Sequence, residues 1–327
     1  MDPLVTALSM VTISCAKRDS LVHLLSAGAG WHVAGSGAVT PALERLWGID
    51  SGSAGDRWTL LGSPGADRGM IRVVAGAERP RTRPIAARWA GAEILVMRDI
   101  DALFERLSRS DAFTVLVPPF DTDWSDVGSN VHRAFIGRAP GGTHLAFTMA
   151  VTQPKGRDFP SAHSKVGHVF DVPLVTVAFE RSRDFYQGSL GMVPILTSRL
   201  QDHQWHEIWR LPPSSVVRLD IIKGDAEGTG LGGIEMQGYD AELVDGEPAL
   251  DHAFDGGACL VTYTSRDISA AYAAVVANPY ARILSEPRSI ESEPYAGRRA
   301  FAFMGPSGER VELCDLPMNL GQRSEAV

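Results

Sequence analysis

The chain repeats one sequence pattern four times, and this repeat constrains its fold more than any other feature. Each copy has a strand rich in β-branched residues, then a short charged hinge, then a helix. The hinge arginines are Arg18, Arg98, Arg181 and Arg266, so successive copies lie 80, 83 and 85 residues apart. Such a regular period predicts four copies of one supersecondary unit that pack against one another.

Each copy is predicted to have the order β-α-β-β-β. Its end is marked by a turn rich in Gly, Pro or Ser followed by a strand, as in "APGGTHLAFTMAV" and "GPSGERVELCD". The helices are expected to begin after Asp or Ser, which suit the N-cap position. Apolar residues in "VPLVTVAF" are too frequent for alternation, which predicts a strand buried on both faces.

A unit of this kind leaves the concave face of its sheet open, so two units are expected to share one core. We therefore predict an α+β fold of four tandem βαβββ modules that form two half-barrel domains. The polar stretch Thr152–Lys165 is interpreted as the linker, which places one domain at residues 1–155 and the other at 156–327. The irregular segment "KGDAEGTGLGGIEMQGYDAELVDGEPALDHAF" is interpreted as a long loop.

The composition and the charge exclude several classes of function. The 327 residues are 44% hydrophobic and carry a formal net charge of −8, which disfavours a nucleic-acid partner. No segment has the ~20 consecutive apolar residues of a membrane span, and the N-terminus lacks a signal-peptide pattern. The three cysteines form no CxxC pattern, so we expect a cytoplasmic protein with buried cysteines.

The third and fourth units contain the most recognisable phrases, "ERSRDFYQGSLGM" and "FAFMGPSGERVEL". With these phrases and its fourfold period, the chain resembles the vicinal oxygen chelate superfamily, which includes glyoxalase I, bleomycin-resistance proteins and extradiol dioxygenases. The resemblance implies that Phe185 and Tyr186 pack the helix of the third module onto its sheet. It also implies that Leu190 and Gly191 end that helix.

Four modules in a chain of this length resemble the extradiol dioxygenases, and this implies a metal site of two His and one Glu. Glu312 in "GERVELCD" falls at the position of the Glu ligand. The nearest histidines are His168 and His252, although the matching positions lie nearer Asp171 and Gly257. Such a ligand set favours Fe²⁺. Other members bind ligands without metal, so the cofactor is expected to be Fe²⁺ or a similar divalent metal, or none.

The segment "QDHQWHEIWRLPP" offers a second candidate site. On a strand, Trp205, Glu207 and Trp209 share one face, whereas His206 and Arg210 share the other. If the first face lines the cavity, the tryptophans would surround the carboxylate and raise its pKa. If the second face does, His206 and Arg210 could bind a carboxylate or a phenolate. A third interpretation has the tryptophans in the core and the charged groups in solvent.

Two function hypotheses follow from this resemblance and these residues. The first is an enzyme acting on a small aromatic or hydrophobic oxygenated substrate, either dioxygenase-like or a metal-free lyase or isomerase. In it the C-terminal pair of modules carries the active cavity, Glu312 binds metal or transfers protons, His206 and Glu207 are acid–base groups, and Trp205, Trp209 and Arg210 bind substrate. The second is a non-catalytic protein that sequesters a small molecule, as bleomycin-resistance proteins do. In both, the expected assembly is a monomer or a homodimer.

Overall fold

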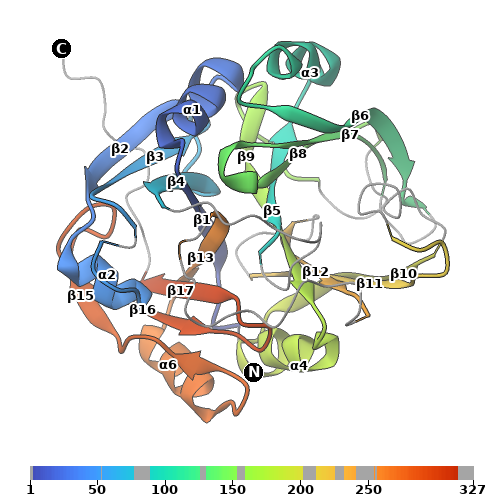
Figure 1. The fold of residues 1–327 in the computed structure, drawn as a ribbon. Coiled ribbons are helices and arrows are strands. Elements are labelled where there is room, and N and C mark those ends of the chain that lie inside the picture. Colours follow the sequence, from blue (N-terminus) through green and yellow to red (C-terminus); the bar gives the residue numbers. More distant parts are fainter. Residues whose placement is uncertain are drawn as a thin grey trace.

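The computed structural model of the chain contains the four predicted modules (Figure 1). It describes residues 3–52, 54–76, 89–125, 130–152, 159–201, 211–224, 232–240, 254 and 256–315. The first module comprises β1 (Ala7–Cys15), α1 (Arg18–His23), η1 (Leu24–Gly28), β2 (His32–Ala38), α2 (Pro41–Trp47), β3 (Arg57–Gly62) and β4 (Met70–Ala75). The second comprises β5 (Gly91–Val96), α3 (Ile100–Ser108), β6 (Thr114–Asp123), β7 (Val131–Arg138), η3 (Pro140–Gly142) and β8 (His144–Ala150).

The third and fourth modules follow the same order. The third comprises β9 (Val166–Thr176), α4 (Phe179–Arg183), η4 (Asp184–Ser189), β10 (Val193–Leu200), β11 (Val217–Lys223) and β12 (Gly233–Gly238). The fourth comprises β13 (Gly257–Ser265), α6 (Ile268–Ala277), β14 (Arg282–Ile283), β15 (Arg288–Ile290), β16 (Arg298–Met304) and β17 (Arg310–Asp315). The prediction of an α+β fold with tandem βαβββ modules in two half-barrels is therefore confirmed.

The two curved sheets combine the modules differently from the prediction. The nine-stranded sheet has the order β14-β16-β17-β13-β1-β4-β3-β2, with β15 beside β16, and so joins the first module to the fourth. The eight-stranded sheet has the order β10-β11-β12-β9-β5-β8-β7-β6 and joins the second module to the third. The division into residues 1–155 and 156–327 therefore matches neither sheet, and the third and fourth modules share no hollow.

The reason for this difference is that the joining contact is made by the first strands of the modules. β1 pairs antiparallel with β13, and β5 pairs antiparallel with β9. Every module has such a first strand, so the repeat does not specify which two modules meet. The connections from β4 to β5 and from β8 to β9 are also similar in length, although only the second stays within one sheet.

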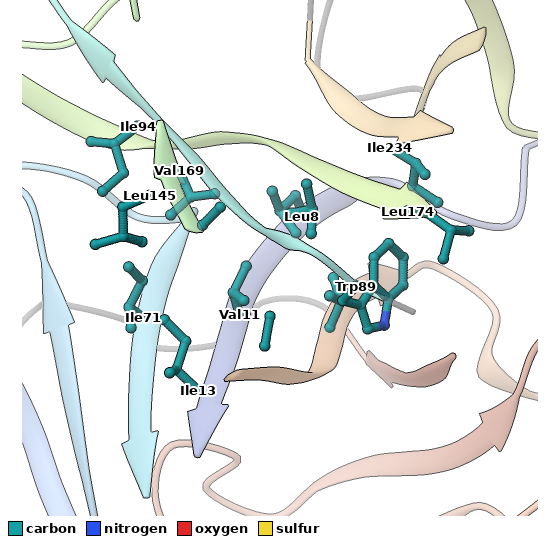
Figure 2. Close-up of a cluster of buried hydrophobic side chains, with 14 of the residues drawn as sticks. Leu8, Val11, Ile13, Ile71, Trp89, Ile94, Leu145, Val169, Leu174 and Ile234 are labelled. Atoms are coloured by element: carbon teal, nitrogen blue, oxygen red, sulfur yellow. The ribbon is translucent and has the colours of Figure 1, made fainter. Parts of the chain in front are cut away.

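The two sheets pack against each other through a large apolar core (Figure 2). Leu8, Val11 and Ile13 of β1 face residues of β5, β8, β9 and β12, which include Ile94 and Leu145. The indole Nε1 of Trp89 also crosses between the sheets, donating to the carbonyl oxygen of Arg310 at 2.7 Å. Burying this many apolar side chains removes them from water, and this burial holds the half-barrels together as one body.

One glycine allows the sheets to approach closely. The backbone N–H of Val169 in β9 donates to the carbonyl oxygen of Gly69 at 2.8 Å, which joins the two sheets. Gly69 has φ +61°, and a Cβ built there would lie 2.1 Å from the carbonyl oxygen of Val169. Both the backbone conformation and the spacing therefore require glycine at this position.

The expected N-cap residue is present at α6, whereas α1 and α4 begin after Lys17 and Ala178, which make no side-chain cap. Asp267 caps α6, since its carboxylate accepts from the N–H groups of Ser269 at 3.1 Å and Ala270 at 2.9 Å. Gly191 has φ +70° and follows the third-module helix, which ends at Ser189. Its N–H donates to the carbonyl oxygen of Gln187, so the expected helix end is confirmed.

Phe185 and Tyr186 pack the third-module helix, and their contacts extend beyond their own module. Both side chains are buried. The ring of Phe185 lies 5.6 Å from that of Phe303 on β16, and the Tyr186 hydroxyl donates to Glu309 Oε1 at 2.6 Å. The phrase thus also attaches this helix to the fourth module, which belongs to the other sheet.

β12 corrects the sequence interpretation of one segment. It lies within the stretch that we interpreted as a long loop, and it is the last strand of the third module. Its sequence, "GIEMQG", is too short and too rich in glycine to stand out as a strand. All its residues are nevertheless buried, because it pairs with β9 and β11 on either side.

The remaining composition-based expectations concern membranes and cysteines. Among the described residues, no helix has the length and apolar character needed to cross a membrane. Cys15, Cys259 and Cys314 are buried free thiols, as expected.

Candidate active site

The second and third modules enclose a cavity on the concave face of their shared sheet. Its volume is ≈ 100 Å³. Most of its lining is apolar or aromatic, including Phe120, Trp124, Phe170, Leu196 and Leu219. Cavities that bind small molecules usually have this composition together with a few convergent polar groups.

The convergent polar groups here are three carboxylates from three neighbouring strands. Glu93 lies on β5, Asp171 on β9 and Glu235 on β12. In the antiparallel ladder of β5 and β9, Glu93 is opposite Asp171. β12 runs parallel to β9, which places Glu235 beside Pro173, two residues along the same face. One oxygen from each carboxylate lies within 4.8 Å of the others.

Each carboxylate is positioned by hydrogen bonds. The Thr148 hydroxyl donates to Glu93, and the backbone N–H of Val172 donates to Asp171 at 2.8 Å. Gln237 Nε2 donates to Glu235 at 2.6 Å, and the Tyr239 hydroxyl in turn donates to Gln237 Oε1 at 2.6 Å. These partners hold the three acidic groups in place before any ligand arrives.

Burial makes all three groups resist ionisation, and repulsion between carboxylates adds to this effect for Asp171 and Glu235. Burial raises the pKa of Glu93. Burial raises the pKa of Asp171 well above its ordinary value, and the charges of Glu235 and Glu93 raise it further. Burial, followed by the charge of Glu93, raises the pKa of Glu235 to about 8. A bound cation would relieve this repulsion, because it would favour the ionised form of every carboxylate.

The donor set fits a divalent metal ion. Two ligand oxygens of one ion lie at most twice the metal–oxygen distance apart, which is about 4.2 Å for Mg²⁺ and about 4.8 Å for Ca²⁺. The three carboxylate oxygens, within 4.8 Å of one another, meet this limit with little or no movement. Carboxylates are the ligands that Mg²⁺, Mn²⁺ and Ca²⁺ prefer.

Two histidines also line the cavity, His132 on β7 and His144 on β8. Burial lowers the pKa of His132 to about 4, so its imidazole is neutral at neutral pH. Its Nε2 lies 2.5 Å from Asn130 Oδ1, which can only accept. Nε2 therefore carries the proton, and Nδ1 is left with the basic lone pair.

The hollow of the first and fourth modules has different chemistry. Glu312 lies there on β17, fully buried, and accepts hydrogen bonds from three side chains. Trp47 Nε1 donates to Oε2 at 3.0 Å, the Thr262 hydroxyl to Oε1 at 3.0 Å and the Tyr295 hydroxyl to Oε2 at 2.9 Å. The guanidinium of Arg72 lies 3.9 Å away and balances the charge of Glu312.

Two of the three ligands predicted from the resemblance lie on different sheets. His168 lies on β9 in the eight-stranded sheet, and Glu312 lies on β17 in the nine-stranded sheet. Among the described residues, the metal-compatible group of three or more side chains includes neither of them. His252 lies outside the described residues.

The second predicted cluster cannot be placed. Trp205, His206, Glu207, Trp209 and Arg210 all lie outside the described residues, so their assignment to a cavity stays a prediction.

The sequence did not predict the carboxylate cluster, although it indicated the position of one member, Asp171. The ligand position of the third module matches Asp171 more closely than His168, whereas the resemblance implies a histidine there. Glu93 stands in "GAEILVM", in the N-terminal pair of modules, outside the C-terminal pair predicted to carry the active cavity. Glu235 stands in the segment interpreted as a loop. The comparison of Glu235 with Glu312, which are both the third residue of a module's last strand, could have identified it.

The comparisons with known proteins agree with this architecture. No protein-family model and no curated protein sequence matches the chain. Among solved structures, glyoxalase I from Zea mays has a TM-score of 0.59 and 16% identity, with 94% of this chain and 92% of that chain covered. A variant of the same maize enzyme has a TM-score of 0.64 over the same coverage, also at 16% identity.

A third solved structure is a Bacillus subtilis protein provisionally assigned as a dioxygenase. Its TM-score is 0.63 and its identity 10%, with 98% of this chain and 88% of that chain covered. At identities this low the likeness concerns the fold, and it spans nearly the whole of each chain. The chain therefore has the fold of the vicinal oxygen chelate superfamily.

Proposed function

We propose that this protein is an enzyme of the vicinal-oxygen-chelate type whose active site is the hollow of the second and third modules. It would act on a small, mainly apolar substrate that presents two neighbouring oxygen atoms to a divalent metal ion. The observation that carries this proposal is the convergence of Glu93, Asp171 and Glu235 within 4.8 Å in an apolar cavity. Two structures that share the fold bear the names of enzymes, glyoxalase I and a dioxygenase.

Glu93, Asp171 and Glu235 would hold the metal ion, with Mg²⁺, Mn²⁺ or Ca²⁺ as the preferred ions. The chemistry that such an ion supplies when bound is stabilisation of negative charge on a substrate oxygen. An all-carboxylate set differs from the two-His, one-carboxylate set of iron sites that use O₂. A lyase or isomerase reaction therefore fits these donors better than oxidative ring cleavage.

The apolar lining of the cavity would bind the rest of the substrate. Phe120, Trp124, Phe170 and Leu196 contribute aromatic and aliphatic surface around the carboxylates. Excluding water from this space strengthens every electrostatic interaction at the reacting end of the substrate. The aromatic lining favours a flat or branched hydrophobic group next to the two oxygens.

His132 is our candidate for a proton acceptor. It lines the cavity with a neutral imidazole whose Nε2–H donates to Asn130, leaving Nδ1 free of a proton. A positioned neutral imidazole can remove a proton from carbon next to a carbonyl group. His206 and Glu207 remain sequence-based candidates for the same role.

Metal binding by matched variants tests this proposal. Wild-type protein treated with EDTA and then titrated with Mn²⁺ should bind one ion per chain. Glu235→Gln should weaken Mn²⁺ binding by at least about 100-fold. Even the loss of a group that only orients a metal ligand lowers metal affinity by about 10- to 100-fold. The control Glu105→Gln removes an exposed carboxylate on α3 and should bind Mn²⁺ like wild type.

Two results would contradict the proposal. Equal Mn²⁺ affinity of wild type and Glu235→Gln would show that the carboxylates do not form the site. Tight binding of apolar ligands with no turnover of any oxygenated compound, with or without Mn²⁺, would favour the sequestering function instead.

A further inference from the structure

A second, cationic pocket adjoins the carboxylate cavity. Its volume is ≈ 170 Å³, and its polar lining includes Arg68, Ser161, His168 and Lys223. Phe170 lines both this pocket and the carboxylate cavity, so the two are adjacent. The volume is ample for a carboxylate or a phosphate group, since one water needs only about 10–15 Å³ by this kind of measure.

The basic groups of the pocket come from three separate segments of the chain. Arg68 lies in the turn between β3 and β4 of the first module, His168 on β9 and Lys223 at the end of β11. Arg68 therefore comes from the nine-stranded sheet and reaches a pocket of the other sheet. Two cationic side chains and an imidazole thus line one concavity, and groups of these types donate charge-assisted hydrogen bonds to carboxylates and phosphates.

Lys223 is the most constrained of these groups. Its residue is only 2% exposed, so its side chain is held largely out of bulk water. It lines the pocket together with His168. Burial is the largest influence on the pKa of both Asp171 and His168, and the charge of Lys223 acts on both groups in the direction of a lower pKa. The two sites are thus electrostatically opposite and adjacent.

The charged groups that face His168 make the pocket favourable for an anion. Burial lowers the pKa of His168 to about 4, and Arg68 and Lys223 lower it further, whereas Asp67 acts in the opposite direction. Asp67 is largely exposed, with 81% of its side chain accessible, and pairs with Arg68 at 3.2 Å. An anion in the pocket would therefore meet two cations and a neutral imidazole able to donate a hydrogen bond.

We infer that the pocket formed by Arg68, His168 and Lys223 binds an acidic group of the substrate, a carboxylate or a phosphate. This inference rests on the proposed function. In that proposal two neighbouring oxygens of the substrate bind the metal ion, and the acidic group would lie at the opposite end of the same substrate. The substrate is then an amphiphilic small acid: its apolar middle passes Phe170, and its two ends reach sites of opposite charge.

Calorimetric binding to the metal-free protein tests the pocket by itself. The probes are 3-phenylpropionate, its neutral amide and inorganic phosphate. We expect the acid to bind at least about tenfold more tightly than the amide, since a hydrogen bond to a charged group contributes about 1.5–3 kcal/mol. Phosphate should compete with the acid but bind more weakly, because it lacks the apolar part.

Two variants make the test specific. Arg68→Met removes one cation from a turn and should abolish the preference for the acid over the amide. Arg109→Met removes an arginine whose side chain is 78% exposed on the surface near α3, and it should keep that preference. Circular dichroism confirms that both variants are folded, and Arg68→Lys should restore part of the preference.

The outcomes separate this inference from the proposed function. Equal affinity for acid and amide, no binding of any probe, or an unchanged preference in Arg68→Met would overturn the inference. Phosphate binding as tight as that of the acid would also overturn it, in favour of a site for free anions. If the wild type binds no Mn²⁺ but Arg68 still controls the preference for the acid, the proposed metal-dependent function fails and the anionic pocket stands.

Discussion

At the scale of single residues, the two hollows show how one position serves two purposes. Glu235 and Glu312 are each the third residue of a module's last strand. Glu235 pairs with Pro173 in its ladder and Glu312 with Thr262, so Leu260 occupies the position that corresponds to Asp171. One hollow therefore gathers carboxylates, whereas in the described part of the other Glu312 lies beside Arg72, which balances its charge.

Arg72 takes the place of a cation in the hollow of the first and fourth modules. Its Nη1 donates to the Tyr295 hydroxyl at 2.7 Å and its Nε to the Thr12 hydroxyl at 2.9 Å. Its guanidinium also lies 4.6 Å from the ring centre of Trp47 on α2. These contacts hold Arg72 beside Glu312, so the carboxylate that falls at the Glu-ligand position implied by the resemblance forms an ion pair within the protein.

We expect Arg72→Met to destabilise the protein by about 3–5 kcal/mol, because it leaves the carboxylate of Glu312 buried without a compensating charge. The double variant Arg72→Met with Glu312→Gln should recover much of this loss. Urea unfolding measures both. Mn²⁺ affinity should stay unchanged in Glu312→Gln, and a loss of Mn²⁺ binding there would restore the sequence-based assignment of Glu312 as a metal ligand.

At the scale of elements, the third-module helix and the turn between β16 and β17 form a buried polar connection. Glu309 accepts from the Tyr186 hydroxyl at 2.6 Å and from the backbone N–H of Ser307 at 2.8 Å. Ser307 also hydrogen bonds with Ser182 at 2.9 Å and with Thr176. The connection links the two sheets, and its carboxylate is enclosed in protein.

Burial raises the pKa of Glu309 from 4.5 to about 7. A carboxyl whose pKa is raised in the folded state contributes stability that is fully present below pH 4.5 and is lost as the pH rises through 7. The loss over this window should amount to up to about 3 kcal/mol. Urea unfolding of wild type and Glu309→Gln in EDTA, at pH 5 and pH 8, isolates this contribution as the difference between the two proteins.

The exposed substitution Glu105→Gln serves as the control and should keep the wild-type pH dependence. If Glu309→Gln and wild type lose the same stability between pH 5 and pH 8, Glu309 does not titrate in this window, and the pH dependence comes from other groups.

At the scale of the whole molecule, the close approach of the two sheets at Gly69 should control stability. Gly69→Ala should destabilise the protein by at least about 2 kcal/mol more than Gly30→Ala, because overpacking adds to the cost of positive φ. Gly30 is a matched control, with φ +78° and no atom within 4 Å of an added Cβ. Equal destabilisation in equilibrium urea unfolding would show that the sheets separate at this point without cost.

The elements predicted from sequence were those that depend on local chemistry. The strand–hinge–helix pattern, the cap at Asp267 and the helix end at Gly191 are confirmed, because each is decided by residues close together in the chain. β12 was missed because its burial comes from β9 and β11 on either side and not from its own short sequence.

By itself, the sequence determined the repeating module, its order of elements and the superfamily fold that four such modules build. Only the tertiary structure decided which modules share a sheet and therefore where carboxylates meet. All four modules offer a first strand for pairing, so the choice depends on contacts between distant parts of the chain. Glu93, Asp171 and Glu235 are 142 residues apart from first to last, and the pairing of β5 with β9 and of β9 with β12 brings them together.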